Sequence, residues 1–329
     1  MSATTTTATR EGGGTFVPRR SGDRRSRGGV PGGPSVVALG GGYGLSASLR
    51  AARRYAGEVT GIVSVADDGG SSGRLRRAFG IPAPGDLRRC LVAVASEGNV
   101  WADAFEHRFD GAELDGHPVG NIILAGLTET LGSFGAAIDE CLRLLGSVGR
   151  VVPATVEPVI LKAVFRDPES PQGHNTVEGE VEVGRTSNLM SIAVVPENPT
   201  VPDEALAAIA RADQLVLGPG SLFTSVLAVL AVPSIRDAVQ LAQGQRIYVA
   251  NLGEQHPETT GFDVADHVAA LSLHGIEVDT VLVDPEGLPL GDVPGHRIVT
   301  HPLAGVHRLH DPGLLAVALQ SLWAGLQPA

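Results

Sequence analysis

An apolar run, a glycine-rich turn and an amphipathic helix follow one another early in the chain, and a second apolar run comes directly after them. Residues 35–39 (SVVAL) predict a short buried strand, and glycines dominate residues 40–44. An amphipathic helix is expected from Leu45 to about Tyr55, and residues 59–65 (VTGIVSV) predict a second strand. A strand, a helix and a strand within about 30 residues form a right-handed βαβ unit, which requires a parallel sheet.

The rest of the chain continues this alternation, with one change of character. Helices are expected at 86–96, 99–109, 119–131, 134–145, 203–212, 222–231, 234–243, 263–274 and 312–326. The apolar runs QLVLG, RIYVAN and VDTVLVD predict strands between the later helices. Residues 150–195 show a period of two instead, in VEPVILKAVF and again in TVEGEVEV, which predicts antiparallel strands on either side of the turn DPESPQGHN. We therefore predict an α/β fold, namely a Rossmann-like, doubly wound, mostly parallel sheet over residues 35–329, with 150–195 as a small antiparallel β insertion.

Residues 1–34 have a different composition from the rest of the chain. They are rich in Thr, Gly, Ser and Arg without apolar periodicity, which predicts a disordered basic tail. The net charge of the whole chain is −11, so the body is strongly acidic. That balance argues against nucleic acid as a partner, because neutralising many phosphates needs Lys and Arg. No apolar run reaches the ~20 residues of a membrane span. The two cysteines, Cys90 and Cys141, suggest no disulfide framework, so we expect a cytoplasmic protein.

The first glycine turn has the composition of a phosphate-binding loop. Gly41, Gly42 and Gly44 would let the backbone approach a phosphate closely, and the helix that follows offers free N–H groups and a partial positive charge. The spacing Gly42-x-Gly44-x-x-Ala47 also matches a dinucleotide pattern, in which Asp67 would meet a ribose hydroxyl. A glycine turn that is needed only for packing is the alternative.

Two carboxylates and two serines follow the second predicted strand. Asp67 and Asp68 stand at the C-terminal end of that strand, where open α/β sheets bind ligands. They could chelate Mg²⁺, hold a ribose or cap the next helix. Gly70, Ser71 and Ser72 offer amide and hydroxyl donors for a phosphate. Mg²⁺ on Asp67 and Asp68 is the one cofactor that this pattern suggests.

A second turn of the same kind occurs late in the chain. Gly218 and Gly220 follow a predicted strand and precede a helix, at whose start Ser221 and Thr224 could bond a phosphate oxygen. Two helix ends that attract anions at one edge of a sheet suit a diphosphate. This interpretation requires the two glycine turns to converge.

Single polar residues complete the predicted ligand site. Arg88 and Arg89 lie in a helix that Asp86 is expected to cap, and either guanidinium could make a bidentate contact with phosphate. Asn121 and Asn251 stand at the ends of predicted elements, where they could bind a ligand or cap the backbone. The sequence shows no nucleophile beside an evident base, no histidine spacing typical of a metal site and no P-loop ending in Gly-Lys-Ser/Thr. A binding protein is therefore favoured over an enzyme, although catalysis stays open.

Taken together, these motifs resemble the YvcK-type proteins, or gluconeogenesis factors, of the family that also contains 2-phospho-L-lactate transferase. The resemblance covers about residue 36 to the C-terminus. It rests on GGGYGLS (40–46), ADDGGSSGRLR (66–76), PGDLRRCL (84–91), GNIILAGL (120–127), LGPGSLFTSV (217–226) and NLGEQHPETTGF (251–262). Three departures from the family pattern occur, one of which is the segment NLGEQHPET in place of the more usual NLMTQPGET. Tyr43 stands where a threonine is usual, and Leu309 precedes His310 and Asp311 where an arginine is usual.

The resemblance implies a Rossmann-like fold that binds a nucleotide or a nucleotide-sugar. YvcK-type members are associated with UDP-sugars, such as UDP-N-acetylglucosamine, with growth on gluconeogenic carbon sources, and with cell shape and wall synthesis. A regulatory protein is the leading hypothesis, with cell-wall synthesis proteins or a second copy of the chain as further partners. The transferase branch implies instead that a phospholactyl-type group is transferred to a deazaflavin, with Mg²⁺ on Asp67 or Asp68. An NAD-dependent dehydrogenase is a third hypothesis, which rests on Gly42-x-Gly44-x-x-Ala47 and Asp67 and which the second glycine turn does not favour.

Overall fold

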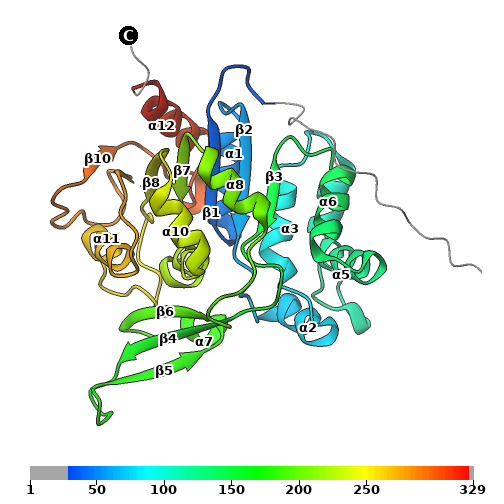
Figure 1. Cartoon of the computed structure of the whole chain (residues 1–329), viewed down its shortest axis with the longest axis horizontal. Helices are drawn as coiled ribbons and strands as arrows, with labels where there is room; N and C mark the ends of the chain where they lie inside the picture. The colour runs from blue at the N-terminus through cyan, green and yellow to red at the C-terminus, as the bar shows by residue number, and fades with distance from the viewer. Residues whose placement is uncertain (1–28, 326–329) are drawn as a thin grey trace, which may run out of the picture.

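The structure, a computed structural model, describes residues 29–325 and is built around a large sheet of seven strands (Figure 1). These strands are β1 (Ser35–Gly40), β2 (Glu58–Val63), β3 (Arg150–Pro153), β7 (Gln214–Leu217), β8 (Gln245–Val249), β9 (Thr280–Val283) and β10 (Arg297–Thr300). Their order is β10-β9-β8-β7-β1-β2-β3, and every neighbouring pair is parallel. The predicted Rossmann-like α/β fold is therefore confirmed.

The chain winds outward from β1 in two directions. From β1 it passes through α1 (Gly42–Ala52) to β2 and later to β3, whereas β7, β8, β9 and β10 stack on the other side of β1. Leu39 of β1 lies opposite Ile62 of β2 and Leu217 of β7, and all three side chains are buried. The carboxyl ends of β1 and β7 therefore form the topological switch point, where open α/β sheets bind ligands.

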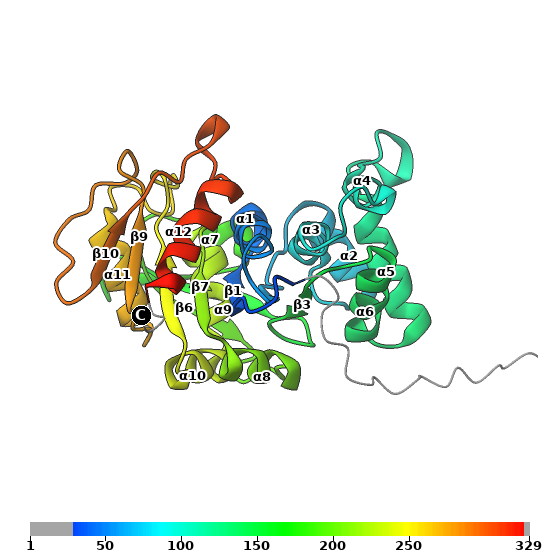
Figure 2. The ribbon, with the colours of Figure 1, turned by 90° about the horizontal axis from the view of Figure 1, so that it is seen from above.

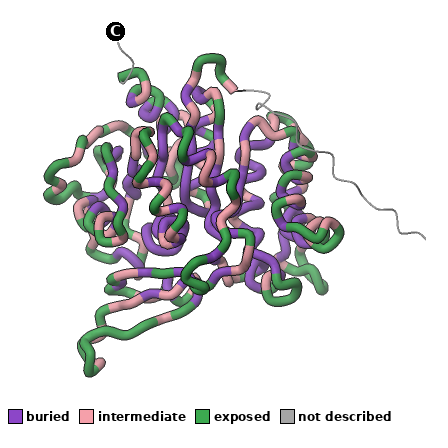
Figure 3. The backbone as a smooth tube through the Cα atoms, viewed as in Figure 1, coloured by how far each residue is buried: buried purple, intermediate pink, exposed green. Residues whose placement is uncertain are grey.

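Helices cover both faces of the large sheet. Figure 2 shows α1, α3 (Pro84–Ala93) and α12 (Pro312–Ala324) over one face, and α8 (Asp203–Arg211) and α10 (Pro233–Leu241) over the other. In Figure 3 the buried residues run along the strands and the sides of the helices that face them. Each large apolar side chain buried there contributes about 1.5–3 kcal/mol relative to an exposed one.

The other helices lie around this core. They are α2 (Gly70–Phe79), α4 (Val100–Glu106), α5 (Val119–Leu131), α6 (Phe134–Leu144), α9 (Ala228–Leu230) and α11 (Val264–Leu273), with the 3₁₀ turns η1 (Ala112–Leu114) and η3 (Val306–Arg308). The helix expected at 222–231 begins as a π-helical segment, η2 (Leu222–Leu227), because the amide of Val226 donates to the carbonyl of Ser221 at 2.9 Å. Such wide turns often mark functional sites.

A small antiparallel sheet lies at the carboxyl edge of the large one (Figure 1). Its strands, in the order β5-β4-β6, are β4 (Ile160–Arg166), β5 (His174–Glu178) and β6 (Leu189–Val195). The first strand of the segment 150–195, β3, belongs instead to the large sheet, so the antiparallel part begins at Ile160.

The prediction that TVEGEVEV forms one strand is wrong. Gly179, at a φ of 97°, ends β5, and Glu180–Gly184 then form one helical turn, α7. Asp68 stabilises this turn, because its Oδ1 accepts the amide hydrogen of Val181 at 3.1 Å. A partner from another part of the chain, together with the glycine, overrides the alternating pattern.

Two further points concern the ends of the described region. The strand β10 has no counterpart among the predicted elements, and the predicted tail lies outside the described residues, except for 29–34. Over residues 29–325, no individual helix combines the length and apolarity that crossing a membrane requires. One bent pair of helices, Leu222–Leu230 with Pro233–Leu241, is long and apolar enough for such a crossing only when both helices are counted together.

Candidate functional site

The two glycine turns lie in direct contact at the switch point. A Cβ on Gly44 would lie 2.0 Å from the carbonyl oxygen of Pro219, so only glycine allows this approach. Gly42, Gly218 and Gly220 have φ values of 59°, 81° and 139°, which favour glycine. Hydrogen bonds between β1 and β7 bring the turns together, since each turn directly follows its strand. The convergence that a shared diphosphate requires is therefore present.

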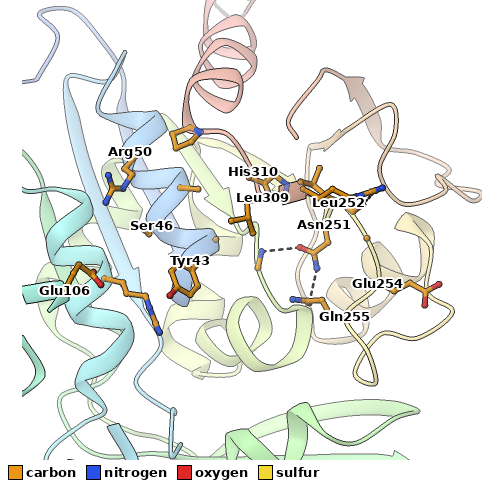
Figure 4. A pocket seen from close by; sticks show the side chains of 17 residues that line it. Tyr43, Ser46, Arg50, Glu106, Asn251, Leu252, Glu254, Gln255, Leu309 and His310 are labelled. Atoms are coloured by element: carbon orange, nitrogen blue, oxygen red, sulfur yellow. Dashed lines mark hydrogen bonds between the residues drawn. The ribbon is translucent and has the colours of Figure 1, made fainter. Parts of the chain in front are cut away.

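A cavity of about 640 Å³ opens beside these turns (Figure 4). It lies between α1, the loop after β8 and the segment before α12, and such a volume is typical of ligand pockets. Three arginines line it, Arg50, Arg89 and Arg308, together with the acidic Glu106 and Glu254. The remaining lining residues are Tyr43, Gly44, Ser46, Ala47, Gly220, Asn251, Leu252, Gly253, Gln255, Leu309, His310 and Pro312.

The N-terminus of α1 points into this region with part of its hydrogen-bonding capacity free. Gly41 is the N-cap residue and has no side chain to cap the helix. The amide of Gly42 bonds to Asp86, whereas no acceptor among the described residues takes the amide hydrogens of Tyr43 and Gly44. Free first-turn amides carry the positive end of the helix dipole, so this end of α1 can bind an anion.

Asp86 and Arg89 form an ion pair beneath the first turn. Arg89 Nη1 donates to Asp86 Oδ1 at 2.8 Å, and the guanidinium carbon of Arg89 lies 4.6 Å from the centre of the Tyr43 ring. Burial raises the pKa of Asp86, and the positive charge of Arg89 opposes that shift. The pair therefore fixes the position of an arginine in the cavity wall.

Asn251 joins the second glycine turn to the loop after β8. Its Oδ1 accepts the amide hydrogen of Gly220 at 3.2 Å, and its Nδ2 donates to Gln255 Oε1 at 3.0 Å (Figure 4). Asn251 and Gly220 both line the cavity. Asn251 thus belongs to the predicted site, where its amide holds the backbone in place.

The helix end after the second turn is occupied by a side chain of the protein itself. The carboxylate of Glu258 accepts the amide hydrogen of Phe223 at 2.7 Å, lies 2.6 Å and 2.5 Å from Ser221 Oγ, and accepts from Thr224 Oγ1 at 3.2 Å. Glu258 is only 5% exposed, and burial raises its pKa despite these donors. Ser221 and Thr224, which we predicted to bind phosphate, therefore bind a carboxylate here.

The loop that follows β2, which contains Asp67 and Asp68, lies outside the cavity lining. Asp67 Oδ1 accepts the amide hydrogen of Gly69 at 2.9 Å, and Asp68 caps α7 as described above. Ser71 Oγ lies 2.8 Å from His117 Nδ1 and accepts from Asn121 Nδ2 at 3.0 Å, which links α2 to α5 and to the loop before α5. The other predicted residues of this loop, Gly70 and Ser72, begin α2. The structure thus groups Asn121 with Ser71, apart from the cavity.

Arg88 does not line the cavity, whereas its neighbour Arg89 and its ion-pair partner Glu106 do. Only 2% of Arg88 is exposed, and its Nη1 pairs with Glu106 Oε2 of α4. Burial and this ion pair leave Arg88 as a link between α3 and α4. Of the two arginines predicted for a phosphate contact, Arg89 is therefore the one at the cavity.

Several residues of this region were not predicted. Arg50 and Arg308 line the cavity, and Arg50 lies one helical turn beyond Ser46 and Ala47 on α1, so the period of the helix could have identified it. Glu180 of α7 lies near Asp67, Asp68 and Asp86. Burial, and then repulsion from these carboxylates, raises the pKa of Glu180 to about 8. Within residues 29–325, no group of three or more His, Cys, Asp or Glu side chains is arranged to hold a metal ion.

Comparison with known proteins places this site in a family. Residues 36–293 match the model of the family described as 2-phospho-L-lactate transferase CofD. The gluconeogenesis factor of Bacillus subtilis is 40% identical over 260 residues, which cover 78% of this chain and 80% of that protein. A relative in Mycobacterium leprae is 41% identical over 313 residues, which cover 89% of this chain and 87% of its own length.

A solved structure extends the similarity to three dimensions. The crystal structure of a UPF0052 family member from Bacillus halodurans matches with a TM-score of 0.80 and 34% identity, over 87% of this chain and 98% of that one. The sequence comparison and the fold comparison therefore point to the same family. The chain belongs to the CofD family, within its YvcK-type group of gluconeogenesis factors.

Proposed function

We propose that this protein binds a nucleotide-sugar, such as UDP-N-acetylglucosamine, in the cavity at the switch point, and that it is a regulator rather than an enzyme. One observation carries the proposal. The two glycine turns meet beside the free amides of α1, in a cavity whose wall contains Arg50, Arg89 and Arg308. Amides at a helix N-terminus together with arginines are the usual ligands of a diphosphate.

The cavity wall favours binding over catalysis. Its one histidine, His310, has Nε2 3.1 Å from the carbonyl oxygen of Ala250, which makes Nε2 the donor and Nδ1 the basic nitrogen of the ring, and no hydroxyl or thiol among the described residues hydrogen-bonds to that Nδ1. Ser46 lines the cavity, and no base among the described residues hydrogen-bonds its hydroxyl. We therefore propose that a bound nucleotide-sugar is released unchanged. The Bacillus subtilis relative is named a gluconeogenesis factor, and we propose the same role here, in gluconeogenic growth and in wall synthesis.

Isothermal titration calorimetry with UDP-N-acetylglucosamine, UDP-glucose and UDP tests the proposal. We expect heat of binding and a rise in melting temperature, since a ligand that binds only the native state stabilises it. The Arg50→Ala variant should bind at least about fivefold more weakly, because it loses a phosphate partner worth ~1 kcal/mol or more. Arg211→Ala, at the exposed end of α8 and outside the cavity lining, is the matched control and should bind as the unmodified protein does. Absence of binding with all three ligands would refute the proposal.

A second function is supported by the family match and by the carboxylates near α7. Mg²⁺ commonly binds one or two carboxylates together with phosphate oxygens, so Asp67 and Asp68 fit such an ion by donor type without a complete cage of protein ligands. In a transferase these two residues would hold Mg²⁺, which would neutralise charge on a transferred phosphoryl group. The Asp68→Asn variant keeps an oxygen that can accept the amide hydrogen of Val181, so α7 should stay intact. Loss of a Mg²⁺-dependent transfer to a deazaflavin in this variant would favour the transferase alternative.

A further inference from the structure

We propose that the ring of Tyr43 is the platform on which the heteroaromatic base of the ligand stacks. The proposal rests on the proposed function and adds to it the part of the nucleotide that this residue recognises. Nothing in the phosphate-binding role of the glycine turn requires an aromatic residue at its centre.

Tyr43 is the one position of the turn 40–44 at which a side chain fits. A Cβ on Gly41 would lie 2.5 Å from Asp86 Oδ2, and a Cβ on Gly44 would lie 2.0 Å from the backbone of Pro219. Gly40 and Gly42 have φ values of 151° and 59°, which disfavour any side chain. The only group that the turn itself can project toward the cavity is therefore the one attached to residue 43.

The Tyr43 ring is exposed and yet held in place. The residue is 73% exposed although it lines the cavity, and Figure 4 shows Tyr43 at the start of α1. The guanidinium of Arg89 covers one face at 4.6 Å, and the bond from Arg89 to Asp86 fixes that guanidinium. A ring covered on one face and exposed over most of its area is available for stacking on the other.

The other residues of the cavity wall offer no equal surface. Among the lining residues only His310 carries another aromatic ring, and its Nε2 is bonded to the carbonyl of Ala250. Tyr43 also belongs to the first turn of α1, whose free amides would hold the phosphates. A base on Tyr43 and phosphates on α1 would thus lie close to each other, as a nucleotide requires, since one ribose joins its base to its phosphates.

Titration of matched variants with UDP-N-acetylglucosamine tests the proposal. Tyr43→Phe keeps the ring and should bind within about threefold of the unmodified protein, whereas Tyr43→Leu keeps apolar bulk without a π face. Since stacking of a base on an aromatic ring is worth about 1–3 kcal/mol, Tyr43→Leu should weaken binding roughly 5- to 150-fold. Inorganic pyrophosphate, used as a competitor, has no base, and its affinity should be the same in all three proteins.

A spectroscopic measurement identifies the contact directly. The uracil H5 and H6 resonances should move upfield on binding to the unmodified protein and to Tyr43→Phe, and much less on binding to Tyr43→Leu. Because Tyr43 is largely exposed, the melting temperatures of both variants should stay within about 2 °C of the unmodified protein.

The outcomes separate this proposal from the proposed function. If the unmodified protein binds the nucleotide-sugar and Tyr43→Leu binds it equally well, or if Tyr43→Leu weakens pyrophosphate to the same extent, the platform is refuted and nucleotide-sugar binding stands. If the unmodified protein binds neither UDP nor its sugars, both proposals fail together.

Discussion

The two glycine turns resemble each other in sequence, yet single residues give their helix ends different roles. The end of α1 follows Gly41, which has no side chain, and it keeps the amides of Tyr43 and Gly44 free. The end of η2 receives the carboxylate of Glu258, an anion supplied by the protein itself. A helix N-terminus attracts either anion for the same electrostatic reason. What distinguishes the two ends is how many of their donors a carboxylate of the chain occupies, since Asp86 takes only the amide of Gly42, whereas Glu258 accepts from Ser221, Phe223 and Thr224.

Glu258 should therefore be important for stability and for the shape of the cavity. Glu258→Ala removes the carboxylate that accepts from Ser221, Phe223 and Thr224, and leaves the buried amide of Phe223 without its acceptor, so we expect it to lower the free energy of unfolding by about 2–4 kcal/mol. Glu258→Gln keeps an acceptor and removes a buried charge, so its cost should stay below about 1 kcal/mol. Urea denaturation measures both. Glu254→Ala, on the exposed part of the same loop, is the control and should lie within about 0.5 kcal/mol of the unmodified protein. Equal losses in Glu258→Ala and Glu258→Gln would contradict this account.

For helices and strands, the hydrophobic pattern along the chain predicts those elements whose conformation depends mainly on residues that are close in sequence. The period of 3.6 residues placed α5 at 119–131, and apolar runs placed β1 and β7, because local packing produces those patterns. Alternation failed at α7, where Gly179 and a contact with the distant Asp68 decide the conformation. The approach of Glu258 to η2 could not be predicted either, and the sequence left open whether Arg88 or Arg89 faces the ligand. Both depend on contacts between segments that are distant in sequence, and hydrophobic periodicity carries no information on such contacts.

The position of Glu180 on α7, close to Asp67 and Asp68 of the loop after β2, makes the stability of the protein depend on pH. The pKa of Glu180 is raised to about 8 by burial and by nearby Asp67, Asp86 and Asp68, so the native state holds a proton that the unfolded chain releases near its ordinary pKa of about 4.3. Stability from this group is present below about pH 4.3 and is lost as pH rises toward about 8. Glu180→Gln removes this dependence. Relative to the unmodified protein, the free energy of unfolding of the variant should rise by about 1–3 kcal/mol between about pH 5 and pH 8. The effect is kept to this size because Glu180 is partly exposed to solvent, which screens its charge.

Urea midpoints at the two pH values measure this gain. Glu182→Gln, on the same turn but more than half exposed and paired with Arg185, is the control and should show a much smaller change with pH. A Glu180→Gln variant whose stability relative to the unmodified protein is the same at both pH values would show that the carboxyl group ionises normally.

At the scale of the whole molecule, the two halves of the sheet meet where the glycine turns touch. β2 and β3 extend from one side of β1, and β7 to β10 from the other, and each half contributes one turn to the switch point. Asn251 and Glu258 connect the loop after β8 to the second turn and its helix. The cavity therefore has walls from both halves, and its shape depends on how closely the two turns approach.

Gly44 sets that approach, and replacing it with alanine should separate the turns. The added Cβ would lie 2.0 Å from the oxygen and 2.5 Å from the carbon of the Pro219 carbonyl, and this backbone, unlike the end of a flexible side chain, cannot move aside without moving the turn. We expect Gly44→Ala to lower the free energy of unfolding by about 1–3 kcal/mol and to reduce nucleotide-sugar affinity by at least about tenfold. Gly126→Ala is the matched substitution, since its Cβ meets no atom within 4 Å on α5, where alanine favours the helix and should add about 0.5–1 kcal/mol. Calorimetric melting and titration of both variants measure these effects. Full ligand affinity in Gly44→Ala would mean that the contact between the turns does not shape the site, because the same change that forces the turns apart would then leave the ligand unaffected.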